Sequence, residues 1–201
     1  LTAFLGDGEN QVFSGSGDDF IFCGNSSNYV YGGAGDDVLI GGSKFNNLHG
    51  GQGDDKLFFG QGDLVAGGQG KDHFVVVDKD SQLHTPTISP VFYEKGMPSS
   101  FSPPLPAPPV VVQKPTQHIT IKDLSFLEGD VLDLQLFQGL SRENLHHVDN
   151  SGILSIETKY QKIDLHVGHE IDLFGGIDNL IWRGVLLVGG VDGGSYGEGM
   201  F

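Results

Sequence analysis

The chain has 201 residues, and its 26 acidic and 11 basic side chains give a formal net charge of −15 at pH 7. Nucleic acids and anionic membrane surfaces bind cationic proteins, so this charge argues against both as partners and favours cations. Cys23 is the only cysteine, which excludes an intramolecular disulfide bond, and no run of 18 apolar residues predicts a transmembrane segment.

Residues 5–75 consist of a nine-residue unit that occurs eight times, with one residue missing from the seventh copy. Each copy has glycine at its second position, Asn or Asp at its sixth and an apolar residue at its eighth. The first six residues suit a turn, because glycine adopts positive φ without steric cost, and the last three suit a short strand. One unit cannot bury its single apolar side chain, whereas stacked units can, so the repeat predicts a solenoid. The residues expected to face inward are Val12, Ile21, Val30, Leu39, Leu48, Leu57, Val65 and Phe74.

These copies, such as GGAGDDVLI at residues 32–40, resemble the RTX nonapeptide repeat G-G-x-G-x-D-x-U-x, a calcium-binding β-helix motif. In that family two copies form one coil of a right-handed parallel β-roll, and calcium lies between successive turns on the same side. The resemblance implies an all-β chain with such a roll over residues 1–80. Residues 81–117 are then a proline-rich insertion or linker, and residues 118–201 a β-rich C-terminal cap associated with secretion.

If two copies make a coil, even and odd copies lie on opposite edges of the roll. All four even copies have glycine at position four and aspartate at position six, which stacks Asp19, Asp37, Asp55 and Asp72. Neighbouring turns are about 4.8 Å apart, and like charges at that distance repel by roughly 3 kcal/mol at an effective dielectric constant of about 20. Calcium, which binds six to eight oxygens, would remove this repulsion. The three gaps in this row predict about three calcium ions.

The resemblance also implies that backbone carbonyls of the even turns complete the coordination. The predicted metal-site residues are Gly15, Gly17, Asp19, Gly32, Gly33, Ala34, Gly35, Asp37, Gly50, Gly51, Gln52, Gly53, Asp55, Gly67, Gln69 and Asp72. The aspartates at position five, which are Asp18, Asp36 and Asp54, are expected to point to water.

The odd edge has a different chemistry, because three of its four copies carry asparagine at position six: Asn10, Asn28 and Asn46. An amide supplies oxygen without charge, so its affinity for calcium should be lower. Two interpretations stay open: the asparagines hydrogen-bond to one another along the edge, or these turns are degenerate and bind no metal.

All nine prolines lie between Pro86 and Pro115, which predicts a polyproline-type segment. A surface loop or linker is the favoured interpretation, and a docking peptide built on Pro103 and Pro106 is the alternative. Further on, HITIKDLSFLEGDVLDLQLF alternates apolar and polar residues as a half-buried strand does, and it resembles the segment that follows the repeats in many type I secreted proteins.

The remaining segments predict a β-rich cap with at least one helix. GILSIETKYQKIDLHVGHEIDL predicts two strands, and SRENLHH a short helix capped by Ser141. GGIDNLIWRGVLLV is open between helix and strand. On the roll, the outward residues Phe22, Ile40 and Phe58 form an apolar stripe, which we expect the cap, the insertion or a second chain to cover.

No set of residues predicts an enzyme, since nucleophile motifs, recognisable carboxylate pairs and phosphate-binding loops are lacking. His166 and His169 are three residues apart and would face opposite sides of a strand, so ordinary surface histidines are favoured over a transition-metal site. Cys23 has no basic neighbour that would activate a thiolate.

The resemblance implies a function in export. We expect a calcium-binding module that folds after type I secretion and stabilises the C-terminus of a larger secreted or cell-surface protein, such as an adhesin, toxin or hydrolase. Its partners would be calcium and the type I secretion machinery, and its location would be the bacterial cell surface or the medium. The absence of a basic and apolar leader at Leu1 suits that route. The alternative is a binding domain for a surface glycan or protein.

Overall fold

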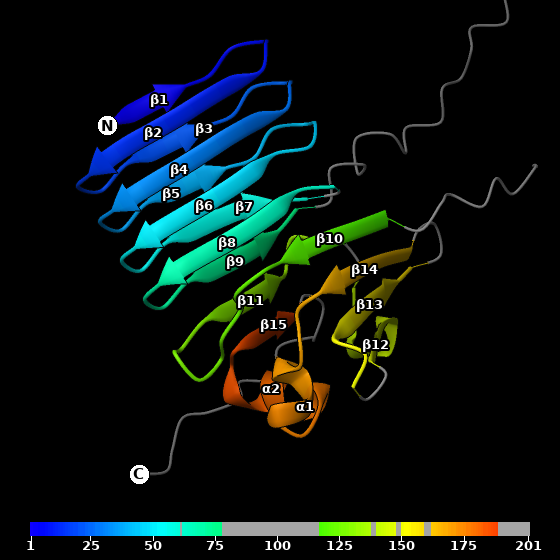
Figure 1. Cartoon of the computed structure of the whole chain (residues 1–201). Coiled ribbons are helices and arrows are strands. Elements are labelled where there is room, and N and C mark those ends of the chain that lie inside the picture. Colours follow the sequence, from blue (N-terminus) through cyan, green and yellow to red (C-terminus); the bar gives the residue numbers. More distant parts are fainter. Residues whose placement is uncertain (61, 78–116, 138–139, 148–149, 159–161, 189–201) are drawn as a thin grey trace, which may run out of the picture.

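The computed structural model of the protein describes residues 1–60, 62–77, 117–137, 140–147, 150–158 and 162–188. Two β-sheets lie against each other, and the chain passes from one to the other through turns at both edges, so that it winds as a flattened coil (Figure 1). The parallel β-roll that the repeat predicts is therefore confirmed.

Among the described residues, the first sheet has seven strands, and all adjacent pairs are parallel. In spatial order they are β1 (Thr2–Phe4), β3 (Phe20–Phe22), β5 (Val38–Ile40), β7 (Lys56–Phe59), β9 (His73–Val76), β11 (Val131–Leu134) and β15 (Leu186–Val188).

The second sheet has eight strands. In spatial order they are β2 (Asn10–Ser16), β4 (Asn28–Ala34), β6 (Asn47–Gln52), β8 (Leu64–Gln69), β10 (Gln117–Ile121), β14 (Lys162–His166), β13 (Ile153–Glu157) and β12 (Leu145–His147). The pairings from β2 to β14 are parallel, whereas β14, β13 and β12 form an antiparallel meander.

The core between the sheets is built from the eighth residue of each copy. Ile21, Leu39 and Leu57 are neighbours in register, and all three have no exposed surface. Because 18 residues separate each of them from the next, one coil contains two copies of the repeat. This stacking lets each copy bury one apolar side chain against its neighbours, which a single copy could not do.

The roll continues after the proline-rich segment. Strand β10 pairs with β8 and strand β11 pairs with β9, so residues 117–134 add a further coil to the stack. The interpretations of the proline-rich segment as a linker or as a docking peptide fall on residues 78–116 and lie outside the described residues.

The C-terminal part closes the open end of the core. SRENLHH forms the short 3₁₀-helix η2 (Arg142–Asn144) after Ser141 and then β12, rather than one helix throughout. The segment that was open between helix and strand contains both: α2 (Ile177–Arg183) ends at Gly184, whose φ of 72° suits a glycine after a helix C-terminus, and β15 follows. A second helix, α1 (Glu170–Leu173), precedes α2, and neither described α-helix is long enough to span a bilayer.

Within the described residues, the C-terminal part does not cover the N-terminal end of the apolar stripe; covering by the insertion falls on residues outside the described ones, and covering by a second chain stays a prediction. Phe22 is 41% exposed, while Ile40 and Phe58 are partly buried. The described C-terminal strands extend both sheets at their edge instead of lying across their outer faces (Figure 1).

Candidate calcium-binding edge

Four aspartates form a buried row along one edge of the roll. Asp19, Asp37, Asp55 and Asp72, here called the aspartate row, are each no more than 3% exposed although they lie in turns. One carboxylate oxygen of each later member accepts the backbone N–H of the member before it. The distances are 2.8 Å from Asp19 N to Asp37 Oδ1, 2.8 Å from Asp37 N to Asp55 Oδ1 and 3.0 Å from Asp55 N to Asp72 Oδ1. The repeat thus fixes every carboxylate in the same orientation.

The second carboxylate oxygen has no such partner in three of the four. Oδ2 of Asp19, Asp37 and Asp55 is buried and accepts no hydrogen bond from the described part of the chain. A Cβ atom added to Gly32 would lie 2.2 Å from Asp37 Oδ2 and 2.8 Å from the Gly50 carbonyl oxygen, so both oxygens face the same space. A buried, unpaired carboxylate oxygen is costly unless a cation or a donor compensates it. Carboxylate and carbonyl oxygens together are the ligands that calcium prefers.

The other predicted site residues lie on the same edge. Gly15, Gly33 and Gly51 are neighbours in register, and so are Ala34 and Gln52. The fourth-position glycines Gly17, Gly35 and Gly53 donate backbone hydrogen bonds to the carbonyls of Ala34, Gln52 and Gln69 at 2.6, 2.8 and 2.8 Å. A carbonyl oxygen has a second lone pair, so these carbonyls keep an acceptor position for a metal ion.

Burial makes the aspartate row hard to ionise without a cation. Desolvation, followed by the charges of neighbouring aspartates, raises the pKa of Asp55 to about 7 and that of Asp72 to about 6. Desolvation also raises the pKa of Asp37.

The position-five aspartates are exposed, as expected, and they support the turns from outside. Asp18 Oδ1 accepts the N–H of Asp36 at 2.9 Å, and Asp36 Oδ1 accepts the N–H of Asp54 at 2.8 Å. Lys71 takes the same position in the next turn, where its N–H donates to Asp54 Oδ1 at 2.8 Å. This outer row is satisfied by the protein itself.

Two further aspartates at this edge were not predicted. The Asp72 N–H donates to Asp130 Oδ1 at 2.9 Å, so Asp130 extends the aspartate row into the coil after the proline-rich segment. Its other oxygen accepts the N–H of Ser125 at 2.8 Å. Asp123 accepts the N–H groups of Gly67 and Gly68 at 2.9 and 3.1 Å. Hydrogen bonds from the chain therefore close the fourth gap.

The opposite edge is held by side-chain amides. The Nδ2 atoms of Asn10, Asn28 and Asn46, here called the asparagine row, donate to the Oδ1 atoms of Asn28, Asn46 and Asp63 at 2.9, 3.1 and 3.2 Å. Each also donates to a carbonyl of its own turn, on Gly8, Ser26 and Lys44, at 2.9, 2.7 and 2.7 Å. Of the two interpretations of this edge, the structure shows the hydrogen-bonded row. On this edge an amide N–H₂ group lies between oxygens of successive turns, whereas the aspartate row has no side-chain donor in that position.

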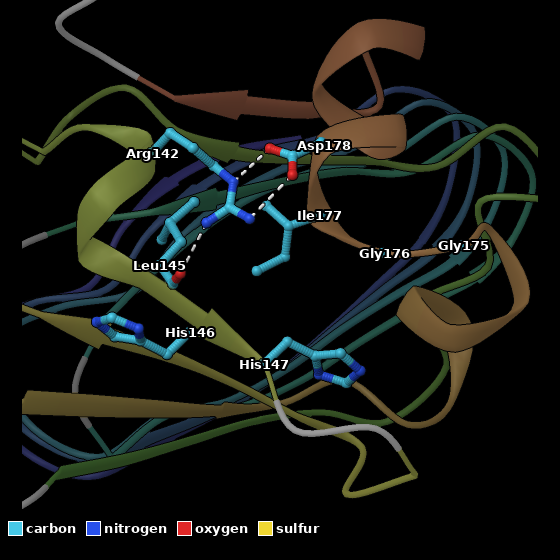
Figure 2. Close-up of a pocket in the computed structure, with 8 residues that line it drawn as sticks. All are labelled: Arg142, Leu145, His146, His147, Gly175, Gly176, Ile177 and Asp178. Atoms are coloured by element: carbon cyan, nitrogen blue, oxygen red, sulfur yellow. Dashed lines mark hydrogen bonds and ion pairs between the residues drawn. The ribbon is translucent and has the colours of Figure 1, made fainter.

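The C-terminal part contains a cavity of about 360 Å³ whose charged groups pair with each other (Figure 2). Arg142 Nε and Nη2 contact the two oxygens of Asp178 at 2.5 and 3.1 Å, and Nη1 donates to the Leu145 carbonyl at 3.0 Å. His147 has both ring nitrogens 2.9 Å from partners, the Ile153 carbonyl and Asp172 Oδ1. These pairs fasten α1 and α2 to the meander rather than presenting charge to a ligand.

A parallel β-roll with a row of buried carboxylates on one edge is a solenoid of the metal-binding kind. Residues 4–39 and 31–63 match the family model of the RTX calcium-binding nonapeptide repeat (four copies), and this repeat region belongs to that family. The solution structure of the AlgE6R3 subunit from the Azotobacter vinelandii mannuronan C5-epimerase is similar to this chain with 18% sequence identity and a TM-score of 0.37, over 93% of this chain and 86% of that one. No curated protein sequence matches the chain.

Proposed function

We propose that three calcium ions occupy the aspartate edge and complete the folding of the roll. The observation that carries this proposal is the set of buried Oδ2 atoms without a partner, on Asp19, Asp37 and Asp55. There is one such atom for each gap between successive members of the aspartate row. At the fourth gap, between Asp72 and Asp130, the corresponding atom is Asp72 Oδ2, which is not among the buried oxygens without a partner.

Each ion would be held by the carboxylates and turn carbonyls of two successive even copies. The proposed ligand-bearing residues are Gly15, Gly17, Asp19, Gly32, Gly33, Ala34, Gly35, Asp37, Gly50, Gly51, Gln52, Gly53, Asp55, Gly67, Gln69 and Asp72. A hard cation with six to eight oxygen ligands suits this donor set, which contains no nitrogen or sulfur. We propose that the asparagine edge takes no calcium, since its amides already join its turns.

Calcium would couple to folding because the site exists only in the coiled chain. Without calcium, the aspartate row places desolvated carboxylates beside each other, which disfavours the folded state. Calcium binds the folded form and stabilises it by mass action. We infer that the chain remains unfolded in low-calcium cytosol, is exported by a type I secretion system and folds outside the cell.

The continuous sheets support a role for this module at the C-terminus of a larger protein. Strands β10, β11 and β15 extend the sheets of the roll, so calcium-driven folding of the repeats would order the C-terminal part as well. We propose a secreted or cell-surface protein, such as an adhesin, toxin or hydrolase, in which this chain has a structural and not an enzymatic role.

The test is to count bound calcium after equilibrium dialysis and to follow strand content by circular dichroism. We expect three calcium ions per chain and loss of the strand signal in excess chelator, with a midpoint of about 10⁻⁴ to 10⁻³ M calcium, as in extracellular modules. A spectrum that does not change in chelator would contradict the proposal.

A second candidate function is the binding of a surface glycan, and a different surface favours it. Phe13, Tyr29, Tyr31 and His49 form a continuous aromatic cluster on the outer face of the eight-stranded sheet, with ring centroids 5.8–6.4 Å apart. Phe13 is 63% exposed and Tyr31 39%. Exposed aromatic clusters mark interaction surfaces. Binding to a glycan array in calcium, lost in Phe13→Ser with Tyr31→Ser, would support this function.

A further inference from the structure

Two histidines meet where the roll joins the antiparallel meander. His118 on β10 and His166 on β14 have their rings 5.5 Å apart, and the distance from His118 Nδ1 to His166 Nε2 is 3.3 Å. The two strands are parallel neighbours, and Ile119 and Leu165 between them point into the core. The imidazoles therefore lie on the outer face of the sheet. His169, the partner considered from sequence spacing, lies instead near Asp172.

The distance between the two nitrogens fits a shared metal ion. Zinc binds imidazole nitrogen at about 2.0–2.1 Å with tetrahedral angles, which places two such nitrogens about 3.3–3.4 Å apart. A hydrogen bond explains the contact only if one ring donates and the other accepts. Within the described part of the chain, neither imidazole contacts another hydrogen-bonding group, so both nitrogens are available to a metal.

One acidic side chain, Asp164, lies beside the pair, and Lys162 Nζ is 3.9 Å from its Oδ1. Asp164 is directly opposite His118 in the strand register and two residues before His166, so it lies on the same face. Its Oδ1 accepts the Ser155 hydroxyl at 2.6 Å, which orients the carboxylate. Imidazole ligands select zinc, copper or nickel over calcium. No group of three or more His, Cys, Asp or Glu side chains arranged for a metal occurs among the described residues, so water would complete the coordination.

We propose that His118 and His166 form a two-histidine surface site for a divalent transition metal, with Zn²⁺ as the reference ion. The ion would tie β10, which pairs with the roll through β8, to β14, which begins the meander. The site is separate from the aspartate row in its donors and its metal. This proposal does not depend on the proposed function, because an experiment can show calcium binding without zinc binding, or zinc binding without calcium binding.

The test uses the full chain without a histidine tag, in saturating calcium so that the aspartate edge is occupied. Calorimetric titration with ZnCl₂ should show one zinc equivalent in the wild type. Long-range ¹H–¹⁵N spectra of the imidazoles should show the signals of His118 and His166 shifting together. Hydrogen exchange of the β14 amides should become slower in zinc.

Three variants decide the assignment. His118→Gln and His166→Gln should each lose the zinc equivalent and the zinc-dependent protection of β14, while their calcium count and circular dichroism stay at wild-type values. His146→Gln is the matched control, because His146 is an exposed histidine of the same meander, and it should retain both effects. If the wild type binds no more zinc than His118→Gln, or if neither imidazole signal moves, the pair is only a hydrogen bond and the proposal is wrong.

Discussion

Asp130 occupies the place next to Asp72 in the buried row, although 58 residues separate the two in sequence. The Asp72 N–H donates to Asp130 Oδ1 at 2.9 Å, with the same geometry that joins successive repeats. Asp130 differs in that Ser125 occupies its second oxygen. Both oxygens of Asp130 therefore accept hydrogen bonds from the chain, whereas Oδ2 of Asp19, Asp37 and Asp55 is left for a cation.

Replacing Asp130 should destabilise the chain without changing the calcium count. Asp130→Ala leaves the N–H groups of Asp72 and Ser125 without their acceptor, which costs about 1–3 kcal/mol for each buried group left unsatisfied. Unfolding in denaturant at saturating calcium measures this loss, and metal analysis should still find three ions. Asp130→Asn keeps one acceptor oxygen and should lose less. A count of two calcium ions in Asp130→Ala would show that the fourth gap contributes to binding.

The proline-rich segment should be replaceable by a short turn. The Val77 N–H donates to the Phe59 carbonyl at 2.6 Å, and the Gly62 N–H donates to the His118 carbonyl at 3.2 Å. Residue 77 thus lies beside residue 59 of the neighbouring coil, and residue 118 lies beside residue 62. In that neighbouring coil a turn of only two residues joins positions 59 and 62. Exchange of residues 78–116 for a copy of the short turn that begins at Gly60 should preserve calcium stoichiometry and the far-ultraviolet spectrum. The same exchange combined with Asp130→Ala is the destabilised control. Loss of calcium binding in the exchange alone would contradict this.

The two edges should respond differently to single substitutions. Asp37 belongs to two gaps of the aspartate row, so Asp37→Asn should lower the calcium stoichiometry below three and raise the calcium midpoint. Asn28→Ala removes amide donors to Ser26 and Asn46, and it should cost about 1–3 kcal/mol of stability with the calcium count unchanged. Calcium counting and denaturant unfolding on both variants make the comparison. Equal losses of calcium in both would show that both edges bind it.

In chelator, the roll should become more stable as pH falls. Desolvation raises the folded-state pKa of Asp55 to about 7, and those of Asp72 and Asp130 to about 6, from an ordinary value of 3.8. The folded chain therefore binds protons more tightly than the unfolded chain between these values. Stability without metal should rise from pH 8 to pH 5, and it should level off near pH 4.

Calcium should reverse this dependence, because the ion requires ionised carboxylates. Its midpoint concentration should increase as pH falls through the same range. The strand signal in circular dichroism at pH 5 and pH 8, in chelator and across a calcium titration, measures both trends. Less strand signal in chelator at pH 5 than at pH 8 would contradict the burial-driven shifts.

Much of the roll could be predicted because the repeat constrains both packing and chemistry. The spacing of Ile21, Leu39 and Leu57 sets two copies per coil, and the glycine pattern sets the turns. Asp130 was missed because its segment lacks the glycines of a nonapeptide. A signal was present, however, since Asp130-Val131-Leu132 repeats the order Asp37-Val38-Leu39.

The C-terminal part was less predictable because its contacts join residues far apart in the chain. His118 meets His166 only because β10 and β14 pair across 48 residues. Similarly, the apolar stripe of Phe22, Ile40 and Phe58 did not indicate that the C-terminal strands extend the edges of the sheets instead of covering their outer faces. The nine-residue repeat predicts how the repeat coils stack on one another. It does not predict where the C-terminal part, which has no repeat, packs against them.

The asparagine row makes the stability of the roll uneven between its two edges. The amide hydrogen bonds of one edge need no ion, whereas the other edge depends on calcium. Loss of calcium would then act as local unfolding of the aspartate turns before the opposite edge opens. Unfolding at intermediate calcium would cease to be two-state, because the aspartate edge would open before the asparagine edge. When calcium is added to the unfolded chain, the asparagine edge would form contacts that need no ion, and the aspartate edge would order against them as its ions bind.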